Sequence, residues 1–119
     1  MATRSARQRL SDILDAIDTI GVFTLGKSFA DYQADRMLRD AVERNIERLS
    51  EAARRLPEDA KAEHPQVAWR SIADIGNVLR HGYDHVADTE IWQVVILELA
   101  PLRHVVITLI AELDEQQGR

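Results

Sequence analysis

Apolar residues recur at intervals of three and four along almost the whole chain, and this period constrains the fold more than any other feature. An α-helix has 3.6 residues per turn, so the spacing places these side chains on one face of a helix. No stretch alternates apolar and polar residues as a half-buried strand would. We therefore predict an all-α fold, an antiparallel four-helix bundle with one short extra helical turn. The four helices are expected at about residues 4–20, 31 or 35 to 56, 65–82 and 88–113.

Glycine and proline residues predict where the helices end. Gly21 follows the first apolar face and is expected to terminate the first helix. The ten residues from Gly21 onward show no helical period, which predicts a loop whose Phe23, Leu25 and Phe29 pack onto the core. Residues 57–66 are polar and contain two prolines, so they are expected to form a connector that includes the extra helical turn.

The last helix is more apolar than one buried face requires. Seven residues form a seam with spacings of three and four, and further apolar residues widen that surface. The helix is therefore expected either to lie at the centre of the fold or to pack against a second subunit. Pro101 lacks a backbone N–H and is expected to kink the helix near Leu97. The seam comprises Trp92, Val95, Leu99, Leu102, Val106, Leu109 and Leu113.

Composition limits the class of protein. With 119 residues, 45% of them hydrophobic and 29% charged, the chain is expected to form one soluble domain over residues 1–119. No apolar run approaches the roughly 18 residues of a membrane span, and the start does not resemble a signal peptide. We therefore expect a cytoplasmic protein without membrane contact. The absence of cysteine excludes thiolate catalysis and cysteine metal sites.

Charge limits the partners. The formal net charge of −5 argues against a protein that coats nucleic acid, because non-specific affinity comes largely from neutralised phosphates. DNA is not an expected partner, whereas a small RNA groove with local arginines is still allowed. Arg4, Arg7 and Arg9 make the start of the first helix basic, which is the unfavourable end of the helix dipole. This suggests either an anionic contact or a frayed, solvated end.

Groups able to do chemistry are densest in the stretch WRSIADIGNVLRHGYDHVADTEIW, which begins at residue 69. On a helix, Asp74, Asn77 and His81 form a polar stripe opposite an apolar one, and Arg80 lies between the two. Gly82 is then expected to end the helix. Such a stripe is either an ordinary solvated face or a functional site, and spacing alone does not decide between them.

Other polar residues also have two interpretations. Asn45 interrupts the apolar face of the second helix, so it either forms a structural hydrogen bond between helices or lines a site. His81 and His85 stand four residues apart, as metal ligands do on a helix. However, Gly82 is expected to break the helix between them, and no third ligand is placed nearby. Neither a metal nor another cofactor is expected.

The same stretch resembles a known family. Trp-Arg-x-Ile, then Asn-x-Leu-x-His-Gly-Tyr and Ile-Trp are similar to the motif of the HepT-like ribonuclease family of the HEPN superfamily. These proteins are the toxin halves of bacterial toxin and antitoxin pairs. GKSFADY, DAVERNIERLSEAARRLP and LELAPLRHVV resemble the family's other recurrent phrases in the same order. The resemblance covers nearly the whole chain.

The resemblance implies a function. It implies a metal-independent endoribonuclease of a type VII-like pair, with tRNA the expected RNA substrate, and a homodimer that brings two motif histidines across one groove. It also implies a partner minimal nucleotidyltransferase, the antitoxin, which neutralises the toxin by transferring AMP to the motif tyrosine. His81 then corresponds to the general acid or base and Tyr83 to the AMP acceptor. Tyr83 alternatively is a core aromatic, because it lies on the apolar stripe.

One residue departs from the family's motif. Gly76 stands where the family has the arginine thought to hold the RNA phosphate. Arg80 is a candidate substitute, because it lies one helical turn later and about 40° round the helix. Asn77 is a candidate for positioning the substrate. Supporting roles are predicted for Asp74, Arg44 and Glu51.

The departure leaves two alternatives to a working ribonuclease. The first is a catalytically degenerate HEPN dimer that acts as the binding and acceptor subunit of the nucleotidyltransferase. The second is an all-α dimerisation module, in which His81 and Tyr83 are ordinary residues at a helix end.

Overall fold

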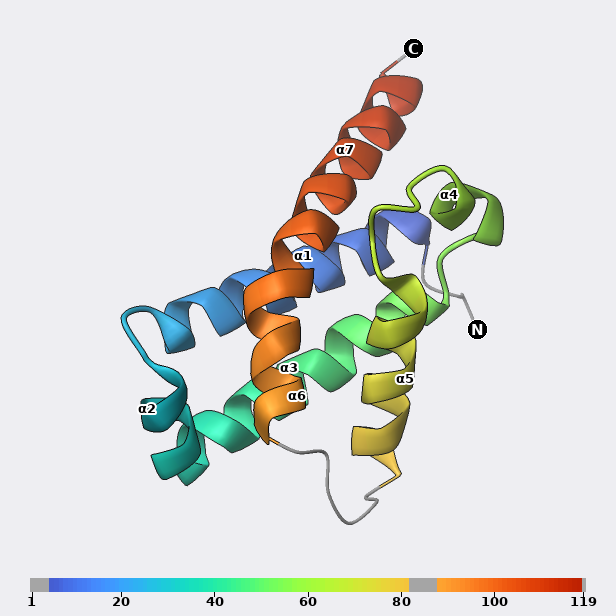
Figure 1. The fold of residues 1–119 in the computed structure, drawn as a ribbon. Helices are drawn as coiled ribbons and strands as arrows, with labels where there is room; N and C mark the ends of the chain where they lie inside the picture. Colours follow the sequence, from blue (N-terminus) through green and yellow to red (C-terminus); the bar gives the residue numbers. More distant parts are fainter. Residues whose placement is uncertain (1–4, 82–87, 119) are drawn as a thin grey trace.

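The computed structural model describes residues 5–81 and 88–118, and helices account for most of both ranges (Figure 1). Neither range contains a strand, which confirms the all-α fold predicted from the apolar period. The elements are α1 (Ala6–Thr24), α2 (Phe29–Ala34), α3 (Arg36–Arg54), α4 (Glu58–Ala62), α5 (Trp69–Arg80), α6 (Asp88–Gln93), the π-helical segment Val94–Glu98 and α7 (Leu99–Gln117).

Helix α3 lies between α1 and α5 and packs against both. Figure 1 shows α1 and α3 side by side and running in opposite directions, with α7 crossing over α1. Helix α5 rests mainly on α3. The geometry of any site on α5 therefore depends on the contact between α3 and α5. The antiparallel arrangement of four helices and the homodimer stay predictions.

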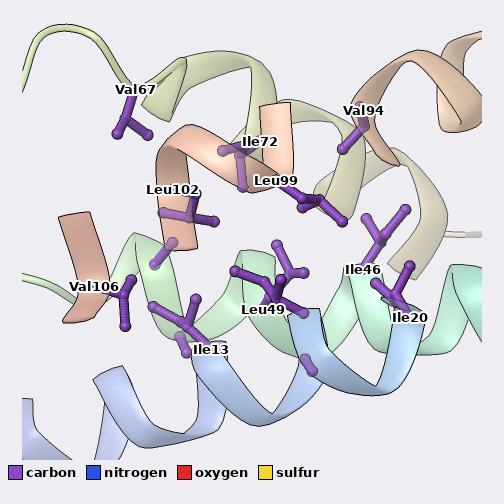
Figure 2. Close-up of a cluster of buried hydrophobic side chains, with 14 of the residues drawn as sticks. Ile13, Ile20, Ile46, Leu49, Val67, Ile72, Val94, Leu99, Leu102 and Val106 are labelled. Carbon is purple, nitrogen blue, oxygen red and sulfur yellow. The ribbon is translucent and has the colours of Figure 1, made fainter. Parts of the chain in front are cut away.

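Aliphatic side chains from four parts of the chain meet in one core (Figure 2). Ile13 comes from α1, Ile46 and Leu49 come from α3, and Ile72 comes from α5; none of the four is exposed. Burying one such side chain stabilises the fold by about 1.5–3 kcal/mol. The C-terminal helices add most of the seam predicted from the sequence, because Leu99, Leu102, Val106 and Leu109 are all buried.

The first helix begins as predicted but ends later. Ser5 caps it, since the Ser5 side chain accepts from the Gln8 N–H at 3.1 Å and the Gln8 side chain accepts from the Ser5 N–H at 2.9 Å. Gly21 does not end the helix, contrary to the prediction, because α1 continues to Thr24. Gly26 makes the turn instead, with a φ of +73° that favours glycine.

Of the two starts predicted for the second helix, Asp35 is confirmed as the N-cap of α3, and Asp31 is wrong because it lies in the separate helix α2. Asp35 ends α2 and caps α3, where its carboxylate accepts from the Leu38 N–H at 3.1 Å. Helix α2 has its own capping box, formed by Ser28 and Asp31. A residue that caps one helix adopts non-helical backbone angles, so a single helix through Asp35 is not possible.

The loop predicted around residue 25 was partly wrong. Phe23 and Leu25 were expected to pack onto the core, but Phe23 is 43% exposed and Leu25 is 83% exposed. The extension of α1 carries both side chains away from the core. Phe29 does pack as predicted, with its ring 6.3 Å from the ring of Trp92.

The helix that contains Pro101 departs from α geometry near Leu97, where the sequence predicts a kink. The segment Val94–Glu98 is π-helical, and the Leu99 N–H bonds to the Val94 carbonyl, five residues back. Proline supplies no N–H to the turn before it, which removes one α-helical hydrogen bond there. The helix is wider at this turn, where the hydrogen bond spans five residues instead of four.

The helix from Asp88 to Gln117 is long and apolar enough, by length and composition, to cross a membrane. Its most apolar 18-residue window has a mean hydropathy of 2.0. The prediction that no apolar stretch approaches this length was therefore wrong for this helix. A core helix of a soluble protein passes the same test, but only 28% of this window is buried. The helix thus leaves apolar surface uncovered, at Ile96, Leu97 and Ile107.

Candidate functional site on helix α5

Helix α5 has the two faces that its sequence predicts. Ile72 and Gly76 are buried, while Trp69, Ile75 and Leu79 pack against the core. The polar stripe of Asp74, Asn77 and His81 is exposed, and so is Arg80, which was predicted to lie between the two stripes. His81 follows the last residue of the helix, and its N–H bonds to the Asn77 carbonyl at 3.1 Å. The polar groups therefore gather at the exposed C-terminal end of α5.

Gly76 lies where α5 packs closely against α3. A side chain at this position would overlap the side chain of Ser50, which is itself buried. The Ser50 hydroxyl also donates to the Ala73 carbonyl at 3.4 Å. Because the glycine has no side chain, the two helices can pack this closely. An arginine at position 76 would have no room without moving α5 away from α3.

Two side-chain oxygen atoms accept hydrogen bonds from Arg80 and hold its guanidinium in place. One guanidinium nitrogen donates to the Glu51 carboxylate at 2.9 Å, and the other donates to the Asn77 side-chain oxygen at 2.9 Å. Glu51 comes from α3 and Asn77 from α5, so the contact between these helices fixes the guanidinium. Arg80 is exposed, and its two hydrogen bonds restrict the conformations of a side chain that would otherwise be flexible.

A single carboxylate serves three guanidinium groups at this point. Besides Arg80, Glu51 bonds Arg54 at 3.2 Å and Arg55 at 3.0 Å. These groups are partly exposed, so each pair contributes little to stability. The effect on the local charge is larger than the effect on stability, because one negative charge neutralises only one of the three positive charges.

A pocket of about 470 Å³ adjoins Arg80, between α1, α3 and α5. We call it the arginine pocket, because four of its eight lining residues are arginines. Three carboxylates also line it. The lining residues are Arg9, Asp12, Arg44, Glu47, Arg48, Glu51, Ala52 and Arg80.

The other flank of α5 carries a second pocket, of about 560 Å³, which we call the acidic pocket. Its charged lining residues are Asp74 of α5, Glu90 of α6 and Glu98 of the π-helical segment. The Ser71 hydroxyl donates to the Glu98 carboxylate at 3.0 Å. Asp74 is therefore separated from Arg80 and Glu51, although the sequence places all three in one predicted site.

Comparison with known proteins identifies the family. The family model described as "Ribonuclease HepT-like" matches residues 13–109, which include all the helices from α2 to α6. The chain belongs to the ribonuclease HepT-like family.

Two relatives of this HepT-like chain have names that state an activity. The chain is 34% identical over 100 residues to "Probable ribonuclease HepT" of Thermococcus cleftensis, covering 84% of the chain and 91% of the relative. It is 34% identical over 96 residues to a "Putative RNase" of Methanocaldococcus jannaschii, covering 81% of the chain and 79% of the relative. No solved structure matches the chain. The family and these names support a ribonuclease function.

Some predicted site residues of the HepT-like chain are not tested by the structure. Tyr83 and His85 lie outside the described residues. Within residues 5–81 and 88–118, no group of three or more side chains is placed to hold a metal ion. Asn45 is buried and bonds the Ala41 carbonyl at 2.9 Å and Arg48 at 2.8 Å, so its hydrogen bonds stay within α3 and do not join two helices.

Sequence reasoning missed two residues that shape this region of the HepT-like chain. Ser50 determines what position 76 can hold, and Arg48 joins the arginine pocket while it binds Asp15 of α1 at 3.1 Å. Ser50 is a small residue within the apolar face of α3, which is the one available signal of a close helix contact. Arg48 follows the helical period of an ordinary surface ion pair, so no local signal separates it from its neighbours.

Two titratable side chains with shifted pKa values lie away from both pockets. Tyr32 is fully buried with its ring 5.1 Å from that of Trp92, and burial raises the pKa of its hydroxyl, which has no hydrogen-bond partner in the described part of the chain. Partial burial also raises the pKa of Glu43, and the nearby carboxylates of Asp40 and Asp88 raise it further.

Proposed function

We propose that this HepT-like chain is a metal-independent endoribonuclease, the toxin of a type VII-like toxin and antitoxin pair, with tRNA as its expected substrate. One observation carries the proposal. In a chain of a ribonuclease family, Glu51 and Asn77 hold the Arg80 guanidinium at the exposed C-terminal end of α5, and His81 is the next residue of the chain. On the alternative interpretation, an ordinary solvated face, the contact between Arg80 and Glu51 is a surface ion pair.

The chemistry assigns one task to each group. RNA cleavage requires the ribose 2′-hydroxyl to lose its proton as the oxygen attacks phosphorus, and the departing 5′-oxygen to gain one. An imidazole moves protons near neutral pH, which makes His81 the general acid or base. The Arg80 guanidinium stabilises negative charge on the phosphate, and Asn77 keeps the guanidinium in place.

The closed position at Gly76 supports Arg80 as the phosphate-binding group. A side chain at residue 76 would overlap Ser50, so this chain cannot carry the family's arginine there with its present helix contact. Arg80 follows one turn later, reaches the surface and is ordered by Glu51. Arg44 lines the same pocket as Arg80 and supports the substrate, whereas Asp74 lies in the acidic pocket.

A homodimer is part of the proposal. Ile96, Leu97 and Ile107 are between 42% and 66% exposed on the C-terminal helices. A second copy of the chain would remove this apolar surface from water, and burying it stabilises association. We expect a cytoplasmic dimer in which the second copy covers this apolar helix. Light scattering is expected to give twice the mass of 13.5 kDa, and a mass near 13.5 kDa at micromolar concentration would exclude the dimer.

The antitoxin is expected to be a minimal nucleotidyltransferase that transfers AMP to Tyr83. The AMP group is a bulky anion, which is expected to block RNA binding. The test is incubation of the chain with the partner enzyme and ATP, followed by mass spectrometry. A Tyr83→Phe variant that is still labelled would move the acceptor to another residue.

Cleavage of total tRNA by the purified chain with EDTA present tests the ribonuclease. His81→Ala is expected to reduce the rate by about 10²–10⁴-fold, and Arg80→Ala by about 10²-fold. Arg36→Ala is the matched control, because Arg36 is an exposed arginine that pairs only weakly with Asp40, at 3.8 Å. Full activity of both site variants would reject the assigned roles.

A specific observation also favours the second candidate function, a catalytically degenerate acceptor subunit. The family's arginine is absent at Gly76, and the helix contact there prevents its return by a single substitution. The two candidates differ in the same assay. A folded parent chain that does not cleave tRNA, yet accepts AMP on Tyr83, would establish the degenerate subunit.

A further inference from the structure

The arginine pocket contains two guanidinium groups that have no partner among the described residues. The side chains of Arg9 in α1 and Arg44 in α3 form no hydrogen bond or ion pair with any described residue. Arg48, by contrast, bonds the Asn45 side chain at 2.8 Å and the Asp15 carboxylate at 3.1 Å. The donors of Arg9 and Arg44 are therefore available to a ligand, and a guanidinium is matched to phosphate or carboxylate oxygens.

The charge around the pocket favours an anion. Four arginines line it against three carboxylates, and one of these, Glu51, is shared with Arg54 and Arg55 outside the pocket. This local excess of positive charge occurs in a chain of net charge −5. The acidic pocket on the other flank of α5 has no arginine or lysine in its lining. Of these two pockets, the arginine pocket is therefore the one that attracts a polyanion.

The pocket is formed by packed helices rather than by a loop. Its arginines come from α1, α3 and α5, and α3 packs against both of the other helices. A volume of about 470 Å³ lies within the range of pockets that bind small molecules. It is large enough for one phosphate with part of its sugar, and its walls are held in place by the core.

Position connects the pocket to the reaction. Arg80 lines the pocket and directly precedes His81 in the chain. An RNA strand whose reacting phosphate lies at Arg80 continues past it, and its neighbouring phosphate then reaches Arg9 and Arg44. We propose that the arginine pocket binds a backbone phosphate of the RNA next to the phosphate that is cleaved, with Arg9 and Arg44 as donors. This subsite rests on the proposed ribonuclease function.

Binding of an RNA that does not react tests the subsite directly. The probe is a fluorescent single-stranded RNA oligonucleotide with 2′-O-methyl groups at every position, followed by anisotropy against the full chain at several salt concentrations. Arg9→Gln and Arg44→Gln are each expected to weaken binding about threefold and the double variant about tenfold. The salt slope is expected to fall by about 0.7 for each phosphate contact that is lost.

Arg36→Gln is the matched control, because it removes one exposed arginine from the same helix outside the pocket. It is expected to change affinity by less than about twofold. Circular dichroism confirms that each variant is folded. An equal loss of affinity in Arg36→Gln and Arg44→Gln would overturn the subsite, because the effect would then be one of overall charge.

A second arm distinguishes RNA from a free anion. If the double variant binds the oligonucleotide normally, while inorganic phosphate protects the parent but not the variant against thermal unfolding, the pocket serves a free phosphate and the proposal is wrong. Failure of the ribonuclease assay has a different signature. A parent chain that does not cleave tRNA but loses oligonucleotide affinity in Arg9→Gln and Arg44→Gln would reject the activity and retain the subsite.

Discussion

Helix α5 separates two pockets of opposite charge. The arginine pocket lies toward α1 and α3 and is lined by four arginines, whereas the acidic pocket lies toward α6 and the π-helical segment and is lined by three carboxylates. The acidic pocket uses Asp74 of the polar stripe, and the arginine pocket uses Arg80, which the sequence places beside that stripe. The elements next to α5 add arginines on the flank of Arg80 and carboxylates on the flank of Asp74. A residue's role on this helix therefore depends on which neighbour it faces.

The comparison requires α5 to be held closely against α3, and the largest expected effect is the loss of that contact. Gly76→Ala would overlap Ser50 and is expected to lower the free energy of unfolding by about 1–3 kcal/mol, and Gly76→Arg by about 3 kcal/mol or more. Urea unfolding followed by circular dichroism measures both. We expect no gain of cleavage in Gly76→Arg, although it restores the family's arginine.

Two further variants sharpen this test. Gly21→Ala is the matched control, because Gly21 also lies in a helix but has no atom near the added carbon; it is expected to raise stability by about 0.5–1 kcal/mol. Ser50→Gly combined with Gly76→Ala removes the overlapping atoms and should recover part of the loss. A Gly76→Ala protein as stable as the parent would show that α3 and α5 do not need this contact.

Removing the Glu51 carboxylate, at the edge of the arginine pocket, should change RNA affinity and the cleavage rate in opposite directions. Glu51→Gln leaves Arg54, Arg55 and Arg80 without their shared partner, so RNA affinity should rise about threefold. The single-turnover rate at saturating RNA should fall about tenfold, because Arg80 is no longer held in position. Glu58→Gln, which removes a paired carboxylate on α4, is the control and should change neither quantity. A rate unchanged in Glu51→Gln would mean that Arg80 needs no positioning.

A positive charge placed in the acidic pocket should have a smaller effect. Asp74→Lys is expected to raise RNA affinity by about twofold through overall charge and to leave the cleavage rate unchanged, because the pocket lies on the other flank of α5 from Arg80. Anisotropy and tRNA cleavage measure the two quantities. Loss of cleavage would return Asp74 to the supporting role predicted from the sequence and remove the distinction between the two pockets.

The smallest expected effect comes from Glu43, which lies outside both pockets. Its pKa is raised, so the folded protein holds this proton to higher pH than the unfolded chain does. Stability therefore falls as pH rises from about the ordinary value of 4.5. Glu43→Gln removes this penalty and should be slightly more stable than the parent at pH 7, with the difference lost near pH 4. Urea midpoints at the two pH values check it, and RNA affinity should not change.

The apolar period predicted the helical faces well. Ile72 and Leu99 are buried where their spacing placed them, because a periodic face has one low-energy arrangement around a core. The helix ends were less predictable. Gly21 is tolerated inside α1 because the next glycine, Gly26, makes the turn, and Asp35 divides a continuous apolar face by capping. A cap is a local hydrogen bond, which a period does not record.

The candidate site was predictable only along one helix. Spacing on α5 brings Asn77 and Arg80 together, and the structure agrees. The other half of the site comes from long-range packing. Arg9 is far from Arg80 in sequence, and Ser50 closes position 76 from another helix, so neither could be recognised from spacing alone. The dimer and Tyr83 stay predictions that rest on the family.

The π-helical segment Val94–Glu98 determines the rotational phase of everything after it. Its hydrogen bonds span five residues instead of four, so the segment changes the angle about the helix axis between the residues before it and those after it. Deleting one residue here would turn α7 by about 100° about its axis. The number of residues between Gln93 and Leu99, more than their identity, therefore selects which side of the C-terminal helix faces solvent.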